Sequence, residues 1–358
     1  MSSPKTPLNI WLIADGLPGN ETQIRGLEAD LRKLGADVEL KSIRSNRWHV
    51  LGAALLGGSG LSIKFDSSDP LQAPWPDFVI GTGRRSGPWV RYVKRASGGK
   101  TKAVMFGQKG ANYMAGLDRG FVLKHWNFPA HPNRISALLP PSGVTLEQLE
   151  TAKTKMPDLL DSKGAPWLLL VVGGRCFDHA FEPEDARDIA SRAASEAKRL
   201  GGSLAIITSR RSGAAVEKAL LEAAPNATFF PASMRPSPLY ALFAQTNAAI
   251  ITGDSESMIA ESIAANLPTY IAPVRPRWSL RMGIERGAWA LYCLGGPLAW
   301  LITCLWKAGV IMPPRSLSAM ANNLVSAQIA HLFDGLIDVT AKPKRSPDDF
   351  MKYFLDRH

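Results

Sequence analysis

The stretch Ala248-Ala-Ile-Ile-Thr-Gly-Asp-Ser-Glu-Ser-Met-Ile-Ala-Glu261 indicates a buried strand, a tight turn and the start of a helix. A similar stretch near the N-terminus reads Asn9-Ile-Trp-Leu-Ile-Ala-Asp-Gly-Leu-Pro-Gly-Asn-Glu-Thr-Gln23. In such a strand–turn–helix unit, the free N–H groups at the start of the helix attract an anion held in the turn. The two stretches therefore predict two nucleotide-binding-like halves.

Strand and helix patterns alternate on either side of both stretches, which is typical of a mostly parallel sheet covered by helices. The predicted fold class is α/β, with two Rossmann-like domains whose sheets face each other across a cleft. We expect an N-terminal acceptor domain over residues 1–150 and a C-terminal donor domain over 160–335. A tail helix over 336–358 is expected to pack back on the N-terminal domain. The predicted strands are 8–14, 38–43, 77–81, 103–106, 167–172, 204–208, 228–230, 248–252 and 269–272, and the predicted helices include 21–34, 85–96, 184–200, 214–224, 237–245 and 255–265.

Composition points to a globular protein of 358 residues with a net charge of +11. Basic residues without acids between them run from Arg84 to Lys109, and others flank an apolar stretch at 48–56. This combination favours an anionic membrane surface or an amphipathic anionic lipid as partner, with a plain solvated basic face as the alternative. Zinc-finger and RNP-like motifs are absent, so no nucleic-acid partner is expected. Three widely spaced cysteines and no signal peptide predict a cytoplasmic protein, peripheral on the inner face of the membrane.

The run 288–306 is uncharged and is interrupted by Gly295-Gly296-Pro297. Its length is close to that of a membrane-spanning helix, but the break leaves two short pieces. Three interpretations stay open, namely a transmembrane helix, a buried helical hairpin and an element that contacts one leaflet. The last is favoured by four aromatic residues of a kind common at membrane interfaces, namely Trp289, Tyr292, Trp300 and Trp306.

Three segments of the second half are candidates for binding a nucleotide diphosphate at the carboxyl ends of strands. Glycines allow a phosphate to approach the backbone, arginines pair with phosphate oxygens, and serines at a helix start bind oxygens. A glutamate further along that helix suits a ribose diol. Ordinary helix capping by Asp254 or Ser255 and a surface basic pair are the structural alternatives. The candidates are Gly173, Gly174, Arg175, Ser209, Arg210, Arg211, Asp254, Ser255, Ser257 and Glu261.

The first half offers Asp15 and Glu21 as alternative general bases for deprotonating an acceptor hydroxyl. Asn20 is interpreted as a possible helix cap. The segment Thr82-Gly-Arg-Arg-Ser86 nearly repeats Thr208-Ser-Arg-Arg-Ser212, which suggests that Thr82, Gly83, Arg84 and Arg85 contact an anionic acceptor. No metal site is expected, because the histidines do not cluster at ligand spacing and no HExxH motif occurs.

Taken together, five motifs resemble the mitochondrial fission, or elongated-mitochondria, family, and they occur in the family's order over about residues 8–275. They are Asp15-Gly-x-x-Gly-Asn-x-x-Gln23, Thr82-Gly-Arg-Arg-Ser86, Val172-Gly-Gly174, Thr208-Ser-Arg-Arg-Ser212 and Thr252-Gly-Asp-Ser-x-Ser-Met-x-x-Glu261. The family is similar to GT-B glycosyltransferases and more distantly to lipid A Kdo transferases. The segments Phe106-Gly-Gln-Lys-Gly110 and Lys124-His-Trp-Asn127 depart from the family pattern.

The resemblance implies a metal-independent glycosyltransferase without a cofactor, for which a nucleotide sugar is the substrate. The sugar would pass to a lipid-linked or envelope glycolipid acceptor. The resemblance adds Met258 to the donor residues and Gly19, Asn20 and Gln23 to the acceptor residues. Two other classes stay open, namely a non-catalytic membrane adaptor with a GT-B fold and a nucleotide-sugar epimerase.

Overall fold

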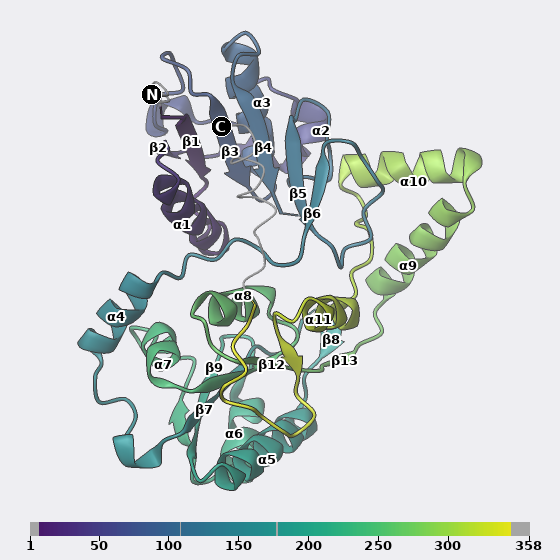
Figure 1. Ribbon diagram of the computed structural model, residues 1–358. Helices are drawn as coiled ribbons and strands as arrows, with labels where there is room; N and C mark the ends of the chain where they lie inside the picture. The colour runs from purple at the N-terminus through teal and green to yellow at the C-terminus, as the bar shows by residue number, and fades with distance from the viewer. Residues whose placement is uncertain (1–6, 108, 177, 345–358) are drawn as a thin grey trace. The chain divides into compact units, whose positions relative to one another are not determined.

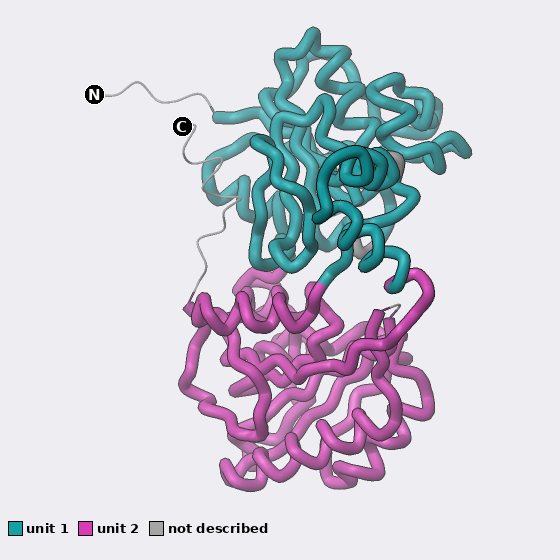
Figure 2. Tube along the Cα trace, turned by 90° about the vertical axis from the view of Figure 1, so that its right-hand side faces the viewer, with its two compact units in different colours: residues 1–143, 283–315, 347–358 teal, residues 144–282, 316–346 magenta. Residues whose placement is uncertain are grey.

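The computed structural model describes residues 7–107, 109–176 and 178–344, which form two compact units (Figure 2). Among the described residues, unit 1 contains 7–143 and 283–315, and unit 2 contains 144–282 and 316–344. Each unit is built around one six-stranded sheet (Figure 1). The two parallel sheets confirm the predicted α/β class with two Rossmann-like domains.

The sheet of unit 1 has the strand order β2-β1-β3-β4-β5-β6, and every neighbouring pair is parallel. Successive side chains of a strand point to opposite faces. Ile10 and Leu12 of β1 therefore pack with Leu27 of α1, whereas Trp11 and Ile13 pack on the other face. The elements are β1 (Asn9–Ala14), α1 (Pro18–Lys33), β2 (Asp37–Ser42), α2 (Gly52–Leu56), β3 (Phe78–Thr82), α3 (Ser86–Ala96), β4 (Lys102–Phe106), β5 (Arg119–Leu123) and β6 (Arg134–Ala137).

The sheet of unit 2 has the order β10-β9-β7-β11-β12-β14 and is also parallel throughout. Its central strands β7, β11 and β12 are buried along their whole length because helices cover the sheet, as expected for parallel strands, whereas the edge strands β10 and β14 are partly exposed. The elements are α4 (Leu146–Lys155), β7 (Trp167–Val172), β8 (His179–Ala180), α5 (Pro183–Arg199), β9 (Ser203–Thr208), α6 (Ala214–Ala223), β10 (Thr228–Phe230), α7 (Leu239–Gln245), β11 (Ala248–Thr252), α8 (Glu256–Ala264), β12 (Thr269–Ala272), β13 (Arg275–Pro276), α11 (Leu317–Ser326) and β14 (His331–Leu332).

The uncharged run 288–306 forms a helical hairpin of α9 (Leu280–Cys293) and α10 (Gly296–Ala308). Gly295 lies at the break with φ +78°, a left-handed conformation that glycine adopts without strain. Trp306 is almost fully buried within the hairpin, where its ring makes tilted contacts with the stacked rings of Trp289 and Tyr292. In the part of the chain that the structure describes, no helix is long and apolar enough to cross a membrane.

Some predicted boundaries are corrected by the structure. The hairpin was predicted in the second domain, whereas 283–315 belongs to unit 1, where the Asn112 side chain donates to the carbonyl of Trp306. Unit 2 begins at Val144, because α4 lies against α7 rather than forming a linker. Of the predicted tail helix, 336–344 is not helical and the remainder, 345–358, lies outside the described residues.

The first helix also begins earlier than predicted. Pro18 occupies the first turn of α1, where its fixed φ suits a helix and its missing N–H is not needed. Leu17 is therefore the N-cap, and Asn20 lies inside the helix rather than capping it.

Candidate functional site

The carboxyl ends of three adjacent strands bring the predicted donor segments together in unit 2. Strands β9, β7 and β11 are neighbours in the parallel sheet, so their carboxyl ends meet at one edge. Segment 209–212 follows β9, Gly173-Gly174 follows β7, and 253–255 follows β11. In open α/β sheets, this edge is where ligands bind.

Gly173 is hydrogen-bonded to the loops on both sides. Its N–H donates to Oγ1 of Thr252 at 2.8 Å, which joins the ends of β7 and β11. Its carbonyl accepts hydrogen bonds from Ser209 Oγ and, at 3.0 Å, from Ser212 Oγ, which join β7 to β9. The three loops therefore form one hydrogen-bonded unit.

An ion pair crosses the same edge. Nη1 of Arg211 lies 2.7 Å from Oδ2 of Asp254, whose side chain is fully buried. Neither carboxylate oxygen receives a hydrogen bond of good geometry from a described residue. Burial raises the pKa of Asp254, and the Arg211 guanidinium partly offsets that rise.

Glycine is required at 173 because of this carboxylate. A Cβ there would lie 2.2 Å from Oδ2 of Asp254. Gly174 has φ +123°, and a Cβ there would lie 2.4 Å from the carbonyl oxygen of Arg211. The two glycines thus allow the three loops to pack closely against one another, and the described residues leave no open space where they meet.

Helix α8 begins directly behind this edge. Ser255 is its N-cap residue, but no side chain caps the helix, so the structural alternative of capping by Asp254 or Ser255 is not found. Ser255 is buried and Ser257, in the first turn, is exposed. The uncapped N–H groups retain the positive end of the helix dipole.

Glu261 lies further along α8, near Tyr240 of α7. Its side chain is 9 % exposed and forms no hydrogen bond or ion pair with any described residue. Burial alone raises the pKa of Glu261 to about 7. Burial and the nearby Glu261 carboxylate raise the pKa of Tyr240 to about 12. A buried carboxylate without a hydrogen-bond or ion-pair partner lowers the stability of the fold unless a ligand supplies that partner.

The remaining donor candidates lie on the surface of unit 2. Arg175 and Arg210 are exposed, and neither side chain is paired with a residue in the described ranges. Met258 is half-buried in α8. Both guanidinium groups are therefore accessible at the surface of unit 2, and their contact with a donor stays a prediction.

The corresponding edge of unit 1 joins Asp15, Asn20 and the loop after β3. Oδ2 of Asp15 accepts from the Asn20 side chain at 2.8 Å, and Oδ1 accepts from the N–H of Leu17 at 3.1 Å. Thr82 Oγ1 donates to the carbonyl of Asn20 at 3.4 Å. Gly83 approaches so closely that a Cβ would lie 2.5 Å from the Asn20 amide nitrogen.

The other acceptor candidates lie apart from this hydrogen-bonded group. Arg84 donates to the carbonyl of Val50 at 2.6 Å. Arg85 is half-buried, and its side chain has no partner among the described residues. Glu21 is exposed on the first turn of α1, and Gln23 of the same helix is half-buried. Gly19 also lies in that first turn.

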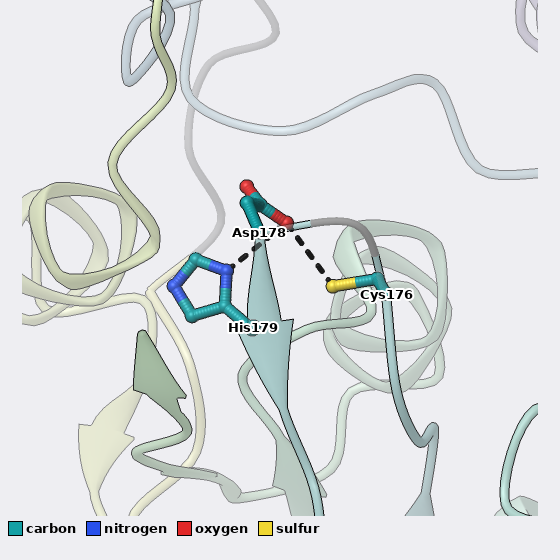
Figure 3. Close-up of side chains that lie close together, drawn as sticks. All are labelled: Cys176, Asp178 and His179. Atoms are coloured by element: carbon teal, nitrogen blue, oxygen red, sulfur yellow. Dashed lines mark hydrogen bonds and ion pairs between the residues drawn. The ribbon is translucent and has the colours of Figure 1, made fainter. Parts of the chain in front are cut away.

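One group that the sequence analysis missed lies on the loop after Gly174. Cys176, Asp178 and His179 each place one potential metal-ligand atom within 4.8 Å of the others (Figure 3). The usual metal-binding patterns consist of clustered histidines or paired cysteines. This group differs from them, because it combines three residue types within four positions. The short pattern Cys-x-Asp-His was the available signal.

A sequence profile described as Mitochondrial fission ELM1 matches residues 18–286. The chain belongs to this family. The match covers the candidate edge of unit 2 and, in unit 1, Asn20 and the loop after β3; it begins three residues after Asp15 and ends inside α9 of this ELM1-family chain. No curated protein matches it.

Solved structures similar to the ELM1-family chain include several glycosyltransferases. MurG of Acinetobacter baumannii is 13 % identical with a TM-score of 0.42, over 98 % of this chain and 91 % of that one. ADP-heptose lipopolysaccharide heptosyltransferase II of E. coli is 13 % identical with a TM-score of 0.41, over 74 % and 84 %. UDP-GlcNAc 2-epimerase of Neisseria meningitidis is 11 % identical with a TM-score of 0.40, over 88 % and 98 %.

Proposed function

We propose that this protein is a glycosyltransferase that takes a sugar from a nucleotide-sugar donor bound at the sheet edge of unit 2. The observation that carries the proposal is Glu261 of α8, a buried carboxylate that forms no hydrogen bond or ion pair with any residue the structure describes. A ribose diol supplies two hydroxyl donors, which match the two oxygens of one carboxylate. Such a ligand would satisfy the group that the fold leaves unpaired.

The diphosphate of the donor would lie at the start of α8. The uncapped N–H groups, the Ser257 hydroxyl and the exposed guanidinium groups of Arg175 and Arg210 are all donors to phosphate oxygens. These groups stabilise negative charge, which grows on the leaving phosphate as the sugar is transferred.

Unit 1 would bind the acceptor and deprotonate its hydroxyl. The hydroxyl oxygen forms a bond to the anomeric carbon, the bond from that carbon to the donor phosphate breaks, and the hydroxyl proton passes to a carboxylate. We favour Asp15 as this base because the Asn20 side chain orients it. Glu21 is exposed and its carboxylate contacts no described residue, so the Glu21→Gln variant is the comparison for Asp15→Asn.

The acceptor would be a membrane lipid or glycolipid reached through one surface of unit 1. Helix α10 lies against α2 (Figure 1), and the hairpin and the loops around α2 expose large apolar side chains. These residues are Trp48, Val50, Leu55, Leu61, Phe65, Leu291, Leu294, Leu298, Trp300 and Leu301. The exposed basic residues Arg286 and Lys307 lie on the same hairpin. Apolar side chains beside cations suit an anionic bilayer surface.

The donor site is tested by calorimetry with UDP-, GDP-, ADP- and CMP-sugars and the free nucleotides. We expect one nucleotide class to bind, and Glu261→Gln to weaken its binding by about tenfold or more, since a hydrogen bond to a charged group is lost. The 2′-deoxynucleotide should show a similar loss with the unchanged protein. Glu222→Gln, an exposed glutamate of α6, is the matched control.

The pH dependence gives an independent check of the same site. The ionised Glu261 accepts from both ribose hydroxyls, so affinity should rise as pH increases through about 7 and then level off. Equal affinity for ribo- and deoxynucleotide, together with unchanged binding in Glu261→Gln, would remove Glu261 from the donor site.

The membrane surface is tested by sedimentation with vesicles of phosphatidylcholine and phosphatidylglycerol. Leu294→Ser removes an apolar side chain that is 74 % exposed on the hairpin and should reduce binding several-fold. Leu146→Ser changes a leucine of unit 2 that is 62 % exposed and should have no effect. Equal binding of both variants would contradict the assignment of the hairpin to the membrane.

A further inference from the structure

The loop after Gly174 holds a compact group of three side chains with different ligand chemistry. Sγ of Cys176 donates to Oδ1 of Asp178 at 3.1 Å, and Nδ1 of His179 lies 3.1 Å from the same oxygen (Figure 3). Asp178 and His179 are buried, with 2 % and 8 % exposure, and Cys176 is half-buried. The three side chains therefore converge in a largely dry environment.

The backbone around this group is held by the small antiparallel sheet of β8 and β13. The N–H of Cys176 donates to the carbonyl of His179 at 3.2 Å, which closes the loop on itself. The N–H of Arg277 donates to the carbonyl of Asp178 at 2.9 Å. The positions of the three side chains are thus set by main-chain contacts and not only by their contacts with each other.

One buried polar atom in the group has no hydrogen bond to the part of the chain that the structure describes. Nδ1 of His179 is inaccessible to solvent and makes no hydrogen bond of good geometry with any described residue, although it lies 3.1 Å from the Asp178 carboxylate. Leaving such an atom without a hydrogen bond is unfavourable. The imidazole nitrogen points at the carboxylate oxygen that also faces the thiol (Figure 3). A cation bound among the three side chains would therefore give this nitrogen a partner.

We propose that Cys176, Asp178 and His179 form a binding site for a borderline-soft divalent metal ion of the Zn²⁺ type. Thiolate, imidazole and carboxylate are the ligands that Zn²⁺ takes, and a set containing sulfur and nitrogen disfavours Mg²⁺ and Ca²⁺. With metal–ligand distances of about 2.0–2.3 Å, the ligand atoms of a tetrahedral site lie roughly 3–4 Å apart. The two separations of 3.1 Å are close to that range.

Charge balance supports a divalent ion. Binding releases the proton of the Cys176 thiol, and the thiolate, the Asp178 carboxylate and a neutral His179 then offset the two positive charges. The loaded site is neutral, which reduces the penalty for burial. Three protein ligands leave a fourth position for water or an oxygen of an exogenous ligand. This site does not depend on the proposed glycosyltransferase function.

The experiment uses the full chain in a Cys293→Ser/Cys304→Ser background, in which Cys176 is the remaining thiol. The reduced, metal-free protein is titrated with Co²⁺ and followed by absorbance. We expect one equivalent to bind, with a near-ultraviolet thiolate-to-cobalt charge-transfer band and the intense visible bands of tetrahedral cobalt. Zn²⁺ should displace Co²⁺ and remove the bands.

Variants of each ligand then locate the site. Cys176→Ser should abolish the charge-transfer band, and His179→Gln and Asp178→Asn should each weaken Co²⁺ binding at least tenfold. His49→Gln, in unit 1, is the control and should leave the titration unchanged. Affinity should increase by up to tenfold per pH unit while one thiol proton is being displaced. Circular dichroism establishes that each variant is folded.

Two results would overturn the proposal. One is a folded parent protein without a charge-transfer band at millimolar Co²⁺, which would leave the three residues as a hydrogen-bonded loop contact only. The other is a band whose affinity is the same in the His179→Gln and Asp178→Asn variants, because the metal would then be held elsewhere. These variants retain Cys176, so they test the site even if Cys176→Ser fails to fold.

Discussion

Two nearly identical segments, Thr82-Gly-Arg-Arg-Ser86 in unit 1 and Thr208-Ser-Arg-Arg-Ser212 in unit 2, follow strands of parallel sheets but make different contacts. In unit 1, Ser86 Oγ donates at 2.6 Å to the carbonyl of Thr82 within its own segment. In unit 2, Ser212 Oγ donates to the carbonyl of Gly173 at the end of the neighbouring strand. One segment closes a local turn, whereas the other joins two loops.

The arginines of the two segments also differ in their contacts. Arg84 donates to a backbone carbonyl at the surface of unit 1, whereas Arg211 pairs with the buried Asp254 across the edge of unit 2. Similar sequence therefore does not imply a similar site. The neighbouring strands decide which contacts such a segment makes, and in unit 2 they bring its serine and its arginine against the ends of β7 and β11.

The acids of the two edges differ in how fully they are satisfied. Asp15 in unit 1 accepts two hydrogen bonds from its own turn and helix. Glu261 in unit 2 is as buried as Asp15 but has no partner among the described residues, and burial raises its pKa to about 7. A buried acid without a hydrogen bond or ion pair lowers stability, which is the arrangement that our proposed donor site requires.

The largest expected effect is a difference in sign between substitutions at these two acids. The folded pKa of Glu261 lies above the unfolded value of about 4.5, so its burial lowers stability as pH rises from about 4.5 to 7, and the loss is constant above that. Glu261→Gln should therefore stabilise unit 2 at pH 8 by roughly 3 kcal/mol and have no such effect at pH 4. Chemical denaturation at both pH values measures this difference.

Asp15→Asn is the counterpart and should destabilise unit 1 by about 1 kcal/mol, because it disrupts hydrogen bonds that are already formed. Loss of stability in Glu261→Gln at pH 8 would show that the carboxylate is satisfied in solution, and the contrast between the two edges would fail.

A smaller effect is expected from adding a methyl group where the loops of unit 2 meet. Gly173→Ala would place Cβ against the Asp254 carboxylate and should lower stability by about 1–3 kcal/mol while abolishing nucleotide binding. Gly83→Ala, at the edge of unit 1, should also destabilise but leave nucleotide affinity unchanged. Thermal unfolding and calorimetry of the two variants separate these effects, and the contrast fails if both lose nucleotide binding.

The smallest expected effect concerns the two arginines. Arg211→Ala leaves the buried Asp254 without its cation and should cost about 1–2 kcal/mol, and the pKa of Asp254 should rise further. Arg84→Ala removes one exposed hydrogen bond and should change stability by less than about 0.5 kcal/mol. The double variant Arg211→Ala/Asp254→Asn should recover most of the loss. Equal effects of both single substitutions would mean that the ion pair contributes little.

Local patterns were sufficient to predict most elements of both sheets. Strand β11 and the start of α8 follow from an apolar run that ends in Gly, Asp and Ser, and α5 follows from its apolar spacing. Strands β5 and β6 were missed. In β6, four residues of mixed polarity lie at the sheet edge and are mostly half-exposed, so no alternation marks the strand.

The sequence by itself determined the two parallel α/β sheets and the residues that follow their strands, because strand and helix periodicity and turn chemistry are local properties. Only the tertiary structure decided that Arg211 pairs with Asp254, that Glu261 is buried with no partner in the described ranges, and that the hairpin from 283 belongs to unit 1. These facts depend on the strand order β9-β7-β11 and on packing between residues far apart in the chain. No local pattern records such contacts.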